Sequence, residues 1–385
     1  MRTASHTSNP ELQSAPPESR RLFLPNFDFE AGLSSPSGQR SREASRRNSE
    51  LAFAWLAVAR PGDAILVDEL PGPDFDLQSL GRLGIKFLRS PQQPQSSIGN
   101  PSPELVPWGW DKPTCNWAES LTLPFKAPPL DVVARVNSRE FSYLLELEFG
   151  CGLPGQAICR SSDEVEQAVR PWPRWLLKGN FSSAGRDRLA GAGPLDERSA
   201  SWVARRLERD GVVLVEPFLE SIAEVGIQWE IPRPPEPPDL IGVVPLLCDE
   251  RGQYRGSVIV NDDSLLEYWR PAVETTRRAV THFQSLGYFG PVGIDAMRYR
   301  DAGGAIRIRP LQDINARWTM GRLALGWRDR IPEGARGVLS SGPEAFSNPE
   351  TIRISPQALG GKPVRHVFSL CVERLEADTS PQSTI

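Results

Sequence analysis

The sequence predicts an α/β fold with an α+β organisation in its second half, and two observations support this. Near the N-terminus, short apolar runs of strand length alternate with helical patterns, which is typical of a parallel α/β unit. Farther along, strand-like segments follow one another, and a long amphipathic helix leads into one more pair of strands. Hydrophobic residues make up 39% of the 385 residues, which is enough to form a sizeable core.

The charge and hydropathy patterns exclude several classes of function. Lys and Arg number 44 and Asp and Glu 48, for a net charge of −4. We therefore expect no general binding to nucleic acid or to an anionic membrane, since both require excess or clustered positive charge. No apolar run approaches the roughly 18 residues of a membrane-spanning helix. The first 20 residues lack the apolar segment of a secretory signal, so we expect a cytoplasmic protein.

Cysteine and histidine usage narrows the metal chemistry. The five cysteines form no C-x-x-C pair, and their odd number favours reduced thiols over a disulfide framework. Of the three histidines, His6 lies in a polar tail and His282 in a predicted helix, so no histidine-rich zinc site is expected. We expect any metal to be held by oxygen ligands, which favours Mg²⁺.

Residues 21–130 are predicted to form a first, small α/β domain. The run 50–59 is predicted to be a helix that ends before Pro61, because proline disfavours helical geometry in the residue before it. The apolar runs 64–67 and 84–88 are predicted to be short strands. Polar composition predicts irregular segments, the first of them a disordered tail, at 1–20, 34–48 and 90–103.

Residues 131–330 are predicted to form the second domain, and 331–385 a C-terminal segment with a polar tail. Helices are expected where apolar residues recur at helical spacing, namely at 137–149, 161–169, 199–209 and 265–286; Ser161 opens a capping box. Strands are expected at the apolar runs 175–178, 212–215, 226–231, 240–247, 253–260, 293–300 and 305–315.

Lys178 is the first residue that suggests a binding site. It ends an apolar strand and precedes the loop Phe181–Arg188, which is rich in small residues. A lysine beside such a loop can clamp a triphosphate, because backbone N–H groups and hydroxyls take the phosphate oxygens. The alternative is a surface lysine before a flexible turn. The spacing is not that of a P-loop.

Two acidic residues follow the next apolar strand. Glu216 precedes Pro217, which makes the segment rigid and extended, and such an edge can offer a carboxylate and backbone groups to an adenine. Glu224 comes before another strand and could accept hydrogen bonds from ribose hydroxyls. The alternative for both is an ordinary strand end with solvated acids.

The last cluster lies on two neighbouring predicted strands. Asp295 interrupts an apolar strand, so it either points outward to water or is buried and needs a cation or hydrogen bonds. Asp313 and Asn315 are two residues apart on the next strand, so they point to one face. Together these oxygen donors make a plausible Mg²⁺ site, and Arg317 continues the same alternation toward a phosphate.

The order of these motifs resembles that of ATP-grasp enzymes. In that family a lysine strand with a Ser/Gly loop is followed by Glu-Pro-Phe, by a strand aspartate and by acid-x-Asn-x-Arg. The segments VVARVNSREFSYLLEL, GIDAM and DINARWTMGR resemble parts of the family pattern, and the resemblance covers 132–327, roughly half of the chain. It implies an ATP-grasp fold after a small Rossmann-like α/β domain, with a lid subdomain at about 160–220.

The resemblance also implies roles for individual residues. Lys178 is implied to contact the ATP phosphates, and the flexible lid over them is implied to be formed by Ser182, Ser183 and Gly185. Glu216 and Phe218 are implied to lie at the adenine, and Glu224 at the ribose. Residues implied to hold Mg²⁺ are Asp295, Asp313 and Asn315. Lys178 and Arg317 are the implied catalytic residues, with Arg317 at the γ-phosphate or acyl-phosphate. Asp313 departs from the usual glutamate, and its shorter side chain would weaken a second metal site.

The implied activity is an ATP- and Mg²⁺-dependent ligase that joins a carboxylate to an amine through an acyl-phosphate. The substrates would be a small acid and a small amine, such as amino acids or peptides, and the sequence does not set the oligomeric state. A non-catalytic ATP-binding protein and a small-molecule kinase of the same fold are the alternatives. Trp108 and Trp110 could line a substrate pocket or could simply pack in the core.

Overall fold

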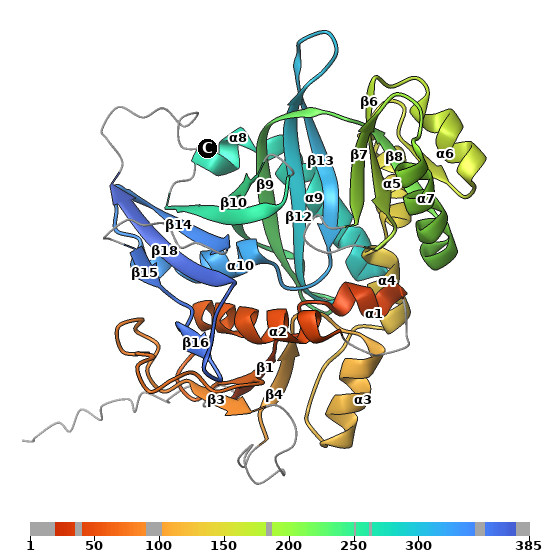
Figure 1. The fold of residues 1–385 in the computed structure, drawn as a ribbon. Coiled ribbons are helices and arrows are strands. Elements are labelled where there is room, and N and C mark those ends of the chain that lie inside the picture. Colours follow the sequence, from red (N-terminus) through yellow and green to blue (C-terminus); the bar gives the residue numbers. More distant parts are fainter. Residues whose placement is uncertain are drawn as a thin grey trace, which may run out of the picture.

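The computed structural model describes residues 20–34, 41–89, 102–181, 187–249, 252–261, 264–342 and 351–374. Three sheets of four or more strands organise this part of the chain, namely a parallel N-terminal sheet, a small antiparallel side sheet and a large central sheet (Figure 1). The predicted disordered tail lies almost wholly outside the described residues, as do Ser182, Ser183 and Gly185. No helix in the described ranges is long and apolar enough to cross a membrane.

The N-terminal sheet contains the two predicted strands and two more that the sequence analysis missed. Its strands are parallel, in the order β3-β2-β1-β4. Their bounds are β1 Arg21–Leu24, β2 Ala64–Val67, β3 Lys86–Arg89 and β4 Glu104–Pro107. The helices are α1 Phe29–Ser34, α2 Arg42–Leu51, the 3₁₀ helix η1 Ala52–Ala57, α3 Lys112–Ser120 and α4 Leu130–Val136. The alternating pattern thus predicted the arrangement correctly.

The prediction of a loop over 34–48 is wrong from Arg42 onward, where α2 begins. The Ser41 hydroxyl accepts the backbone N–H of Ala44, which is a typical N-cap contact. The sequence pattern hid this helix because the side chains that it buries are mostly polar: Asn48, Ser49 and Glu50. The predicted helix 50–59 is in fact the end of α2 followed by η1.

The side sheet has the order β5-β8-β6-β7 and is antiparallel throughout. Its strands are β5 Ala157–Cys159, β6 Arg174–Gly179, β7 Arg188–Ala192 and β8 Val213–Pro217. The neighbouring helices are α5 Arg139–Phe149, α6 Ser162–Val169 and α7 Glu197–Asp210. Ser161 caps α6 as predicted, and α7 ends at Gly211, whose φ of +73° is the left-handed conformation that glycine tolerates.

The central sheet has eight strands in the order β13-β12-β9-β10-β11-β14-β18-β15, all antiparallel to their neighbours. Their bounds are β9 Glu220–Ile231, β10 Asp239–Cys248, β11 Tyr254–Val260, β12 Gly290–Arg300, β13 Ile306–Asn315, β14 Ala335–Gly342, β15 Thr351–Arg353 and β18 Val367–Arg374. A separate short pair is β16 Ala358–Leu359 and β17 Lys362–Pro363. Strands β14, β15 and β18 of the C-terminal segment therefore belong to the central sheet.

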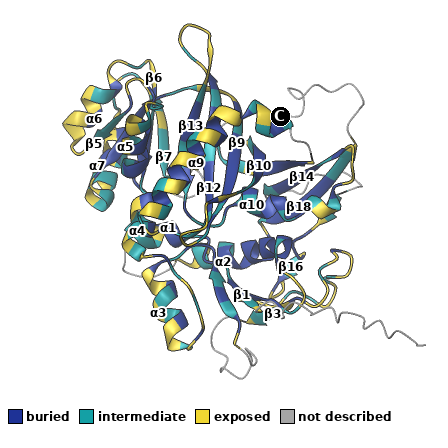
Figure 2. Cartoon of the chain, turned by 180° about the vertical axis from the view of Figure 1, so that it is seen from behind, coloured by how far each residue is buried: buried dark blue, intermediate teal, exposed yellow. Residues whose placement is uncertain are grey.

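The predicted helix 265–286 is divided into α8 Ser264–Tyr268 and α9 Arg270–Ser285. Pro271 lies in the first turn of α9, where its missing N–H is tolerated, whereas in one continuous helix it would remove a hydrogen bond. Figure 2 shows α9 with one buried side against the central sheet and one exposed side. The residues on its buried side are Ala272, Val273, Thr276, Ala279, Val280 and Phe283.

The N-terminal part of the chain packs closely on the segment that follows β13. Trp318 meets Trp55 edge-on, with ring centroids 5.2 Å apart, and donates its backbone N–H to the Trp108 carbonyl at 3.1 Å. At Gly326, just after α10 (Met320–Leu325), an added Cβ would lie 2.4 Å from the Ala57 carbonyl oxygen. At this point the backbone at Gly326 and the backbone at Ala57 are too close together to leave room for any side chain.

We therefore expect Gly326→Ala to lower the free energy of unfolding by about 1–3 kcal/mol through overpacking. The backbone at Gly326 is right-handed helical, so alanine carries no conformational penalty and the loss comes from the collision alone. Denaturant unfolding measures the change. Gly303→Ala is the control, since its Cβ would meet only ordinary contacts, and it should stay within about 0.5 kcal/mol. Equal stability of the two variants would contradict the close packing.

Candidate functional site

Two adjoining cavities lie between the side sheet, the central sheet and the N-terminal part of the chain. The larger has a volume of about 900 Å³ and the smaller of about 320 Å³, both within the range of small-molecule pockets. They share the residues Lys178, Arg188, Glu224, Leu246, Cys248, Gly252, Gln253 and Gln312. The two cavities therefore form one cleft, and Lys178 lies at their junction.

The larger cavity is lined by both apolar and charged side chains. Leu176, Phe218 and Met297 provide apolar surface, and the Arg174 guanidinium carbon lies 3.9 Å from the centre of the Phe218 ring. Lys178 lines the same cavity, so an apolar ring and a polyanion would both find complementary surface there. The positions of Phe218 and Lys178 suit the predicted adenine and phosphate contacts, which stay predictions.

Four charged side chains form a buried network in the wall of the larger cavity. Lys178 Nζ lies 2.7 Å from Glu216 Oε2, and Arg309 Nη2 donates to Glu216 Oε1 at 2.6 Å. Arg309 also donates twice to Glu146, at 2.7 and 2.9 Å. Each side chain is between 1% and 8% exposed, so Lys178 is not the surface lysine of the alternative interpretation. Two cations and two carboxylates neutralise one another, as buried charges require.

Glu216 stays ionised because two cations share it. Burial alone would raise the pKa of its carboxyl, but the charges of Arg309 and Lys178 outweigh burial and lower the pKa of Glu216 to about 2. Burial lowers the pKa of Lys178, and Glu216 opposes that change. The charge of Lys178 therefore depends on a neighbouring anion, and a phosphate group would stabilise it further.

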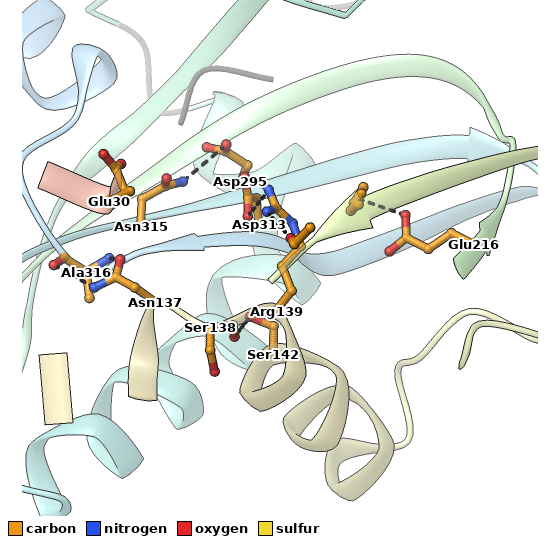
Figure 3. A network of polar contacts seen from close by, with 12 residues as sticks. Glu30, Asn137, Ser138, Arg139, Ser142, Glu216, Asp295, Asp313, Asn315 and Ala316 are labelled. Atoms are coloured by element: carbon orange, nitrogen blue, oxygen red, sulfur yellow. Dashed lines mark hydrogen bonds and ion pairs between the residues drawn. The ribbon is translucent and has the colours of Figure 1, made fainter. Parts of the chain in front are cut away.

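The predicted metal ligands Asp295 and Asp313 lie directly opposite each other on β12 and β13. Opposed residues of antiparallel strands point to the same face, with Cβ atoms about 4.5–5.5 Å apart. Asn315 lies two residues along β13 and donates from Nδ2 to Asp295 Oδ2 at 3.4 Å. Figure 3 shows the three side chains next to one another. The structure thus brings the predicted ligands together.

The chemistry of this pair fits a divalent cation. Burial, followed by the charges of Asp313 and Glu224, raises the pKa of Asp295 to about 8. The charge of Arg317 opposes this change only in part, and Mg²⁺ bound by oxygen ligands would supply further positive charge. Within the described ranges, no group of three or more His, Cys, Asp or Glu is placed to hold a metal ion. The candidate centre is therefore two carboxylates that other oxygen donors must complete.

Two contacts at this centre would have to change when a metal ion binds. Asn315 Oδ1 accepts from Arg317 Nη2 at 2.7 Å, so the amide nitrogen, not the oxygen, faces Asp295. Arg139 Nη2 lies 3.2 and 3.3 Å from the two oxygens of Asp313 and takes part of the position of a cation (Figure 3). Arg139 was missed by the sequence analysis, because there it is only one residue of an amphipathic helix.

Arg317, the other predicted catalytic residue, lines the second cavity. Its Nε donates to Glu30 and its Nη1 donates to the Trp318 carbonyl at 2.9 Å. The Trp108 ring lies beside it, with its centroid 5.4 Å from the guanidinium carbon. Trp108 lines the cavity and also packs on Phe27 with centroids 4.4 Å apart, so it does pack in the core, and its place in a substrate pocket stays a prediction.

Glu224, the predicted ribose contact, lies on β9 beside the candidate metal centre. The register places Glu224 opposite Met297 and Gly226 opposite Asp295. The Cys248 thiol donates to Glu224 Oε2 at 3.7 Å. Glu224 lines both cavities, which suits a residue between nucleotide and metal, and its role at the ribose stays a prediction.

Comparison with known proteins identifies the fold. No protein-family model matches the sequence, and no curated protein matches it. Solved structures do match: the biotin carboxylase–β,γ-ATP complex from Campylobacter jejuni (12% identity, TM-score 0.54, 93% of this chain and 88% of that chain) is one. Another is N5-carboxyaminoimidazole ribonucleotide synthetase from Thermus thermophilus (14% identity, TM-score 0.51, 92% and 93%).

A third match is the biotin carboxylase domain of Hydrogenobacter thermophilus 2-oxoglutarate carboxylase, solved with MgADP, ADP and bicarbonate. It shares 10% identity at a TM-score of 0.53, over 92% of this chain and 86% of that chain. These likenesses span the whole architecture at low identity. The chain has the ATP-grasp fold, as the order of its motifs implied.

The low pKa of Glu216 predicts how the network responds to acid. Glu216→Gln should lower the free energy of unfolding at pH 7 by about 3–5 kcal/mol, because it leaves two buried cations short of a partner. The native pKa of about 2 lies below the ordinary 4.5, so the contribution of the carboxylate is present above pH 4.5 and is lost as the pH falls toward 2. The difference between native protein and variant should therefore narrow across that range.

Urea unfolding at a series of pH values measures this difference. Glu148→Gln is the control, because Glu148 is exposed on the neighbouring helix and should behave like the native protein at each pH. A difference that stays constant from pH 4.5 to 2 would show that Glu216 is not held ionised by its neighbours.

Proposed function

We propose that the protein is an ATP-dependent ligase that joins a carboxylate to an amine through an acyl-phosphate. The observation that carries this proposal is the junction of two cavities at Lys178, beside the opposed carboxylates Asp295 and Asp313. A nucleotide in the larger cavity would have its phosphates near this junction. The second cavity, lined by Arg139 and Arg317, offers room and positive charge for a small acid.

Each group of residues has a distinct task in the proposed reaction. Lys178 stabilises negative charge on the phosphates of ATP. Asp295 and Asp313 hold Mg²⁺, which supplies further positive charge to the transferred phosphoryl group. Arg317 contacts the γ-phosphate, and Arg139 orients the substrate carboxylate against it, since guanidinium groups match the geometry of oxyanions. Catalysis then consists mainly of positioning and charge neutralisation.

The reaction proceeds in two displacements. A carboxylate oxygen of the substrate attacks the γ-phosphorus, the bond between that phosphorus and the bridging oxygen breaks, and ADP leaves with the electron pair. The amine nitrogen then attacks the carbonyl carbon of the acyl-phosphate. The bond from that carbon to the phosphate oxygen breaks, inorganic phosphate leaves, and the amine proton passes to phosphate or solvent.

The contact between Arg139 and Asp313 favours a second candidate, a nucleotide-binding protein without turnover. A guanidinium that stays on Asp313 would compete with the metal ion, and the aspartate is one methylene shorter than the glutamate usual in the resembled family. The two candidates make the same prediction for ATP binding. They differ in whether ADP is formed when an acid and an amine are supplied.

We expect Lys178→Met to weaken the binding of Mg²⁺–ATP about tenfold or more, because it removes a charge-assisted contact to phosphate. Methionine keeps the apolar stem and leaves Glu216 paired with Arg309. Titration calorimetry measures the affinity, and circular dichroism verifies folding. Lys112→Met, at an exposed position, should bind as the native protein does. Native affinity in a folded Lys178→Met protein would refute the phosphate assignment.

The second test of the proposal is the release of ADP. With Mg²⁺–ATP and a screen of amino acids and dipeptides, the native protein should form ADP in excess of the protein only when an acid and an amine are both accepted. Asp295→Asn should reduce that rate at least about a hundredfold, because it removes a charge aimed at the metal. Asp131→Asn, exposed on α4, is the control. Tight ATP binding with no ADP from any pair would favour the non-catalytic candidate.

A further inference from the structure

A buried ion pair joins the N-terminal part of the chain to the residue predicted to contact the γ-phosphate. Glu30 lies in the first turn of α1, and Arg317 follows β13, 287 positions later in the sequence. Their side chains are 6% and 10% exposed. Figure 3 shows Glu30 beside Asn315, one of the candidate metal ligands. The sequence analysis assigned no role to Glu30.

Arg317 is held at three of the five N–H groups that a guanidinium carries. Its Nε donates to Glu30 Oε1, its Nη1 to the Trp318 carbonyl at 2.9 Å, and its Nη2 to Asn315 Oδ1 at 2.7 Å. One N–H on each terminal nitrogen is left over by these contacts. Because Arg317 lines the second cavity, these two donors are available to an oxyanion there.

Glu30 contributes little to the stability of the fold, but it is well placed to orient the Arg317 guanidinium. Its Oε2 is buried and has no hydrogen-bond partner among the described residues. Burial raises the pKa of Glu30, and the charge of Arg317 only partly opposes this. A buried pair of this kind contributes little net stability, because desolvation offsets the attraction. What the contact does accomplish is to hold Nε, so that all three nitrogens of the guanidinium have a fixed partner and its plane is set.

We propose that Glu30 is a positioning residue that holds the Arg317 guanidinium toward the γ-phosphate of ATP. This rests on the proposed function, in which Arg317 contacts the terminal phosphate. Of the three hydrogen bonds of Arg317 to the described residues, the one to Glu30 alone comes from outside the segment Asn315–Trp318, and the Trp108 ring only stacks beside the guanidinium. The N-terminal part of the chain thereby contributes to distinguishing ATP from ADP without touching either nucleotide.

Titration calorimetry with Mg²⁺ and either ADP or a non-hydrolysable ATP analogue tests the proposal. The ratio of the two affinities isolates the γ-phosphate contact, and a general loss of stability would not change that ratio. The variants are Glu30→Ala, Glu30→Gln, Arg317→Ala and the double alanine variant. Asp63→Ala is the control, because Asp63 is also a buried acid of the N-terminal part, paired with Arg21 at 2.6 Å.

We expect the native protein to prefer the ATP analogue, and Arg317→Ala and Glu30→Ala each to reduce that preference about tenfold. The double variant should be no worse than Arg317→Ala alone, since Glu30 acts through Arg317. Glu30→Gln should keep most of the preference, because the glutamine oxygen still accepts the Nε–H. Asp63→Ala should keep all of it.

Other outcomes overturn the proposal. Native preference in Glu30→Ala, or losses that multiply in the double variant, would show that Glu30 does not act through Arg317. An equal loss in Asp63→Ala would show a general effect of the N-terminal part. Equal native affinity for the two nucleotides would remove the γ-phosphate contact, and this proposal with it, yet leave ATP binding intact. Failure of the native protein to bind either nucleotide would instead refute the proposed function as well.

Discussion

The geometry of the candidate site depends on the buried network of Lys178, Glu216, Arg309 and Glu146. Arg309 belongs to the central sheet, Glu216 and Lys178 to the side sheet, and Glu146 to α5, so the network sets how the two sheets face each other. Burial of four charges is unfavourable unless each has its partners. Removal of Glu216 takes away the ion-pair partner of Lys178, and removal of Arg309 takes away that of Glu146. The width of the larger cavity is thus fixed by an interaction that tolerates little displacement.

The candidate metal centre has the opposite character. Asp295 and Asp313 face each other with Glu224 near by, and Arg139, Arg317 and an amide donor oppose their charge only in part. The raised pKa of Asp295 expresses that imbalance. On one side of the cleft lies the charge-balanced network, and on the other lies a pair of carboxylates with excess negative charge. Such a cleft favours a cation together with a polyanion. Trp108 completes the cleft from the N-terminal part of the chain, and Glu30 contacts Arg317, which lines it.

Local patterns in the sequence predicted much of this arrangement. The pairing of β12 with β13, and the shared face of Asp313 and Asn315, follow from strand alternation. Helix α2 was missed because it buries polar residues. Arg139, Arg309 and Glu30 were missed because their ion-pair partners lie 93 to 287 positions away. Arg309 could have been found, since it interrupts an apolar strand as Lys178 does, whereas nothing local distinguishes Glu30.

The most direct test of this account is a crystal structure of the protein with Mg²⁺ and a non-hydrolysable ATP analogue. The account predicts the base in the larger cavity near Phe218, the phosphates at Lys178, and a metal ion between Asp295 and Asp313 at about 2.1 Å from its oxygen ligands. It also predicts that Arg139 has left Asp313. A nucleotide bound outside the cleft, or one bound inside it with Arg139 still on Asp313 and no metal ion between the two carboxylates, would contradict it.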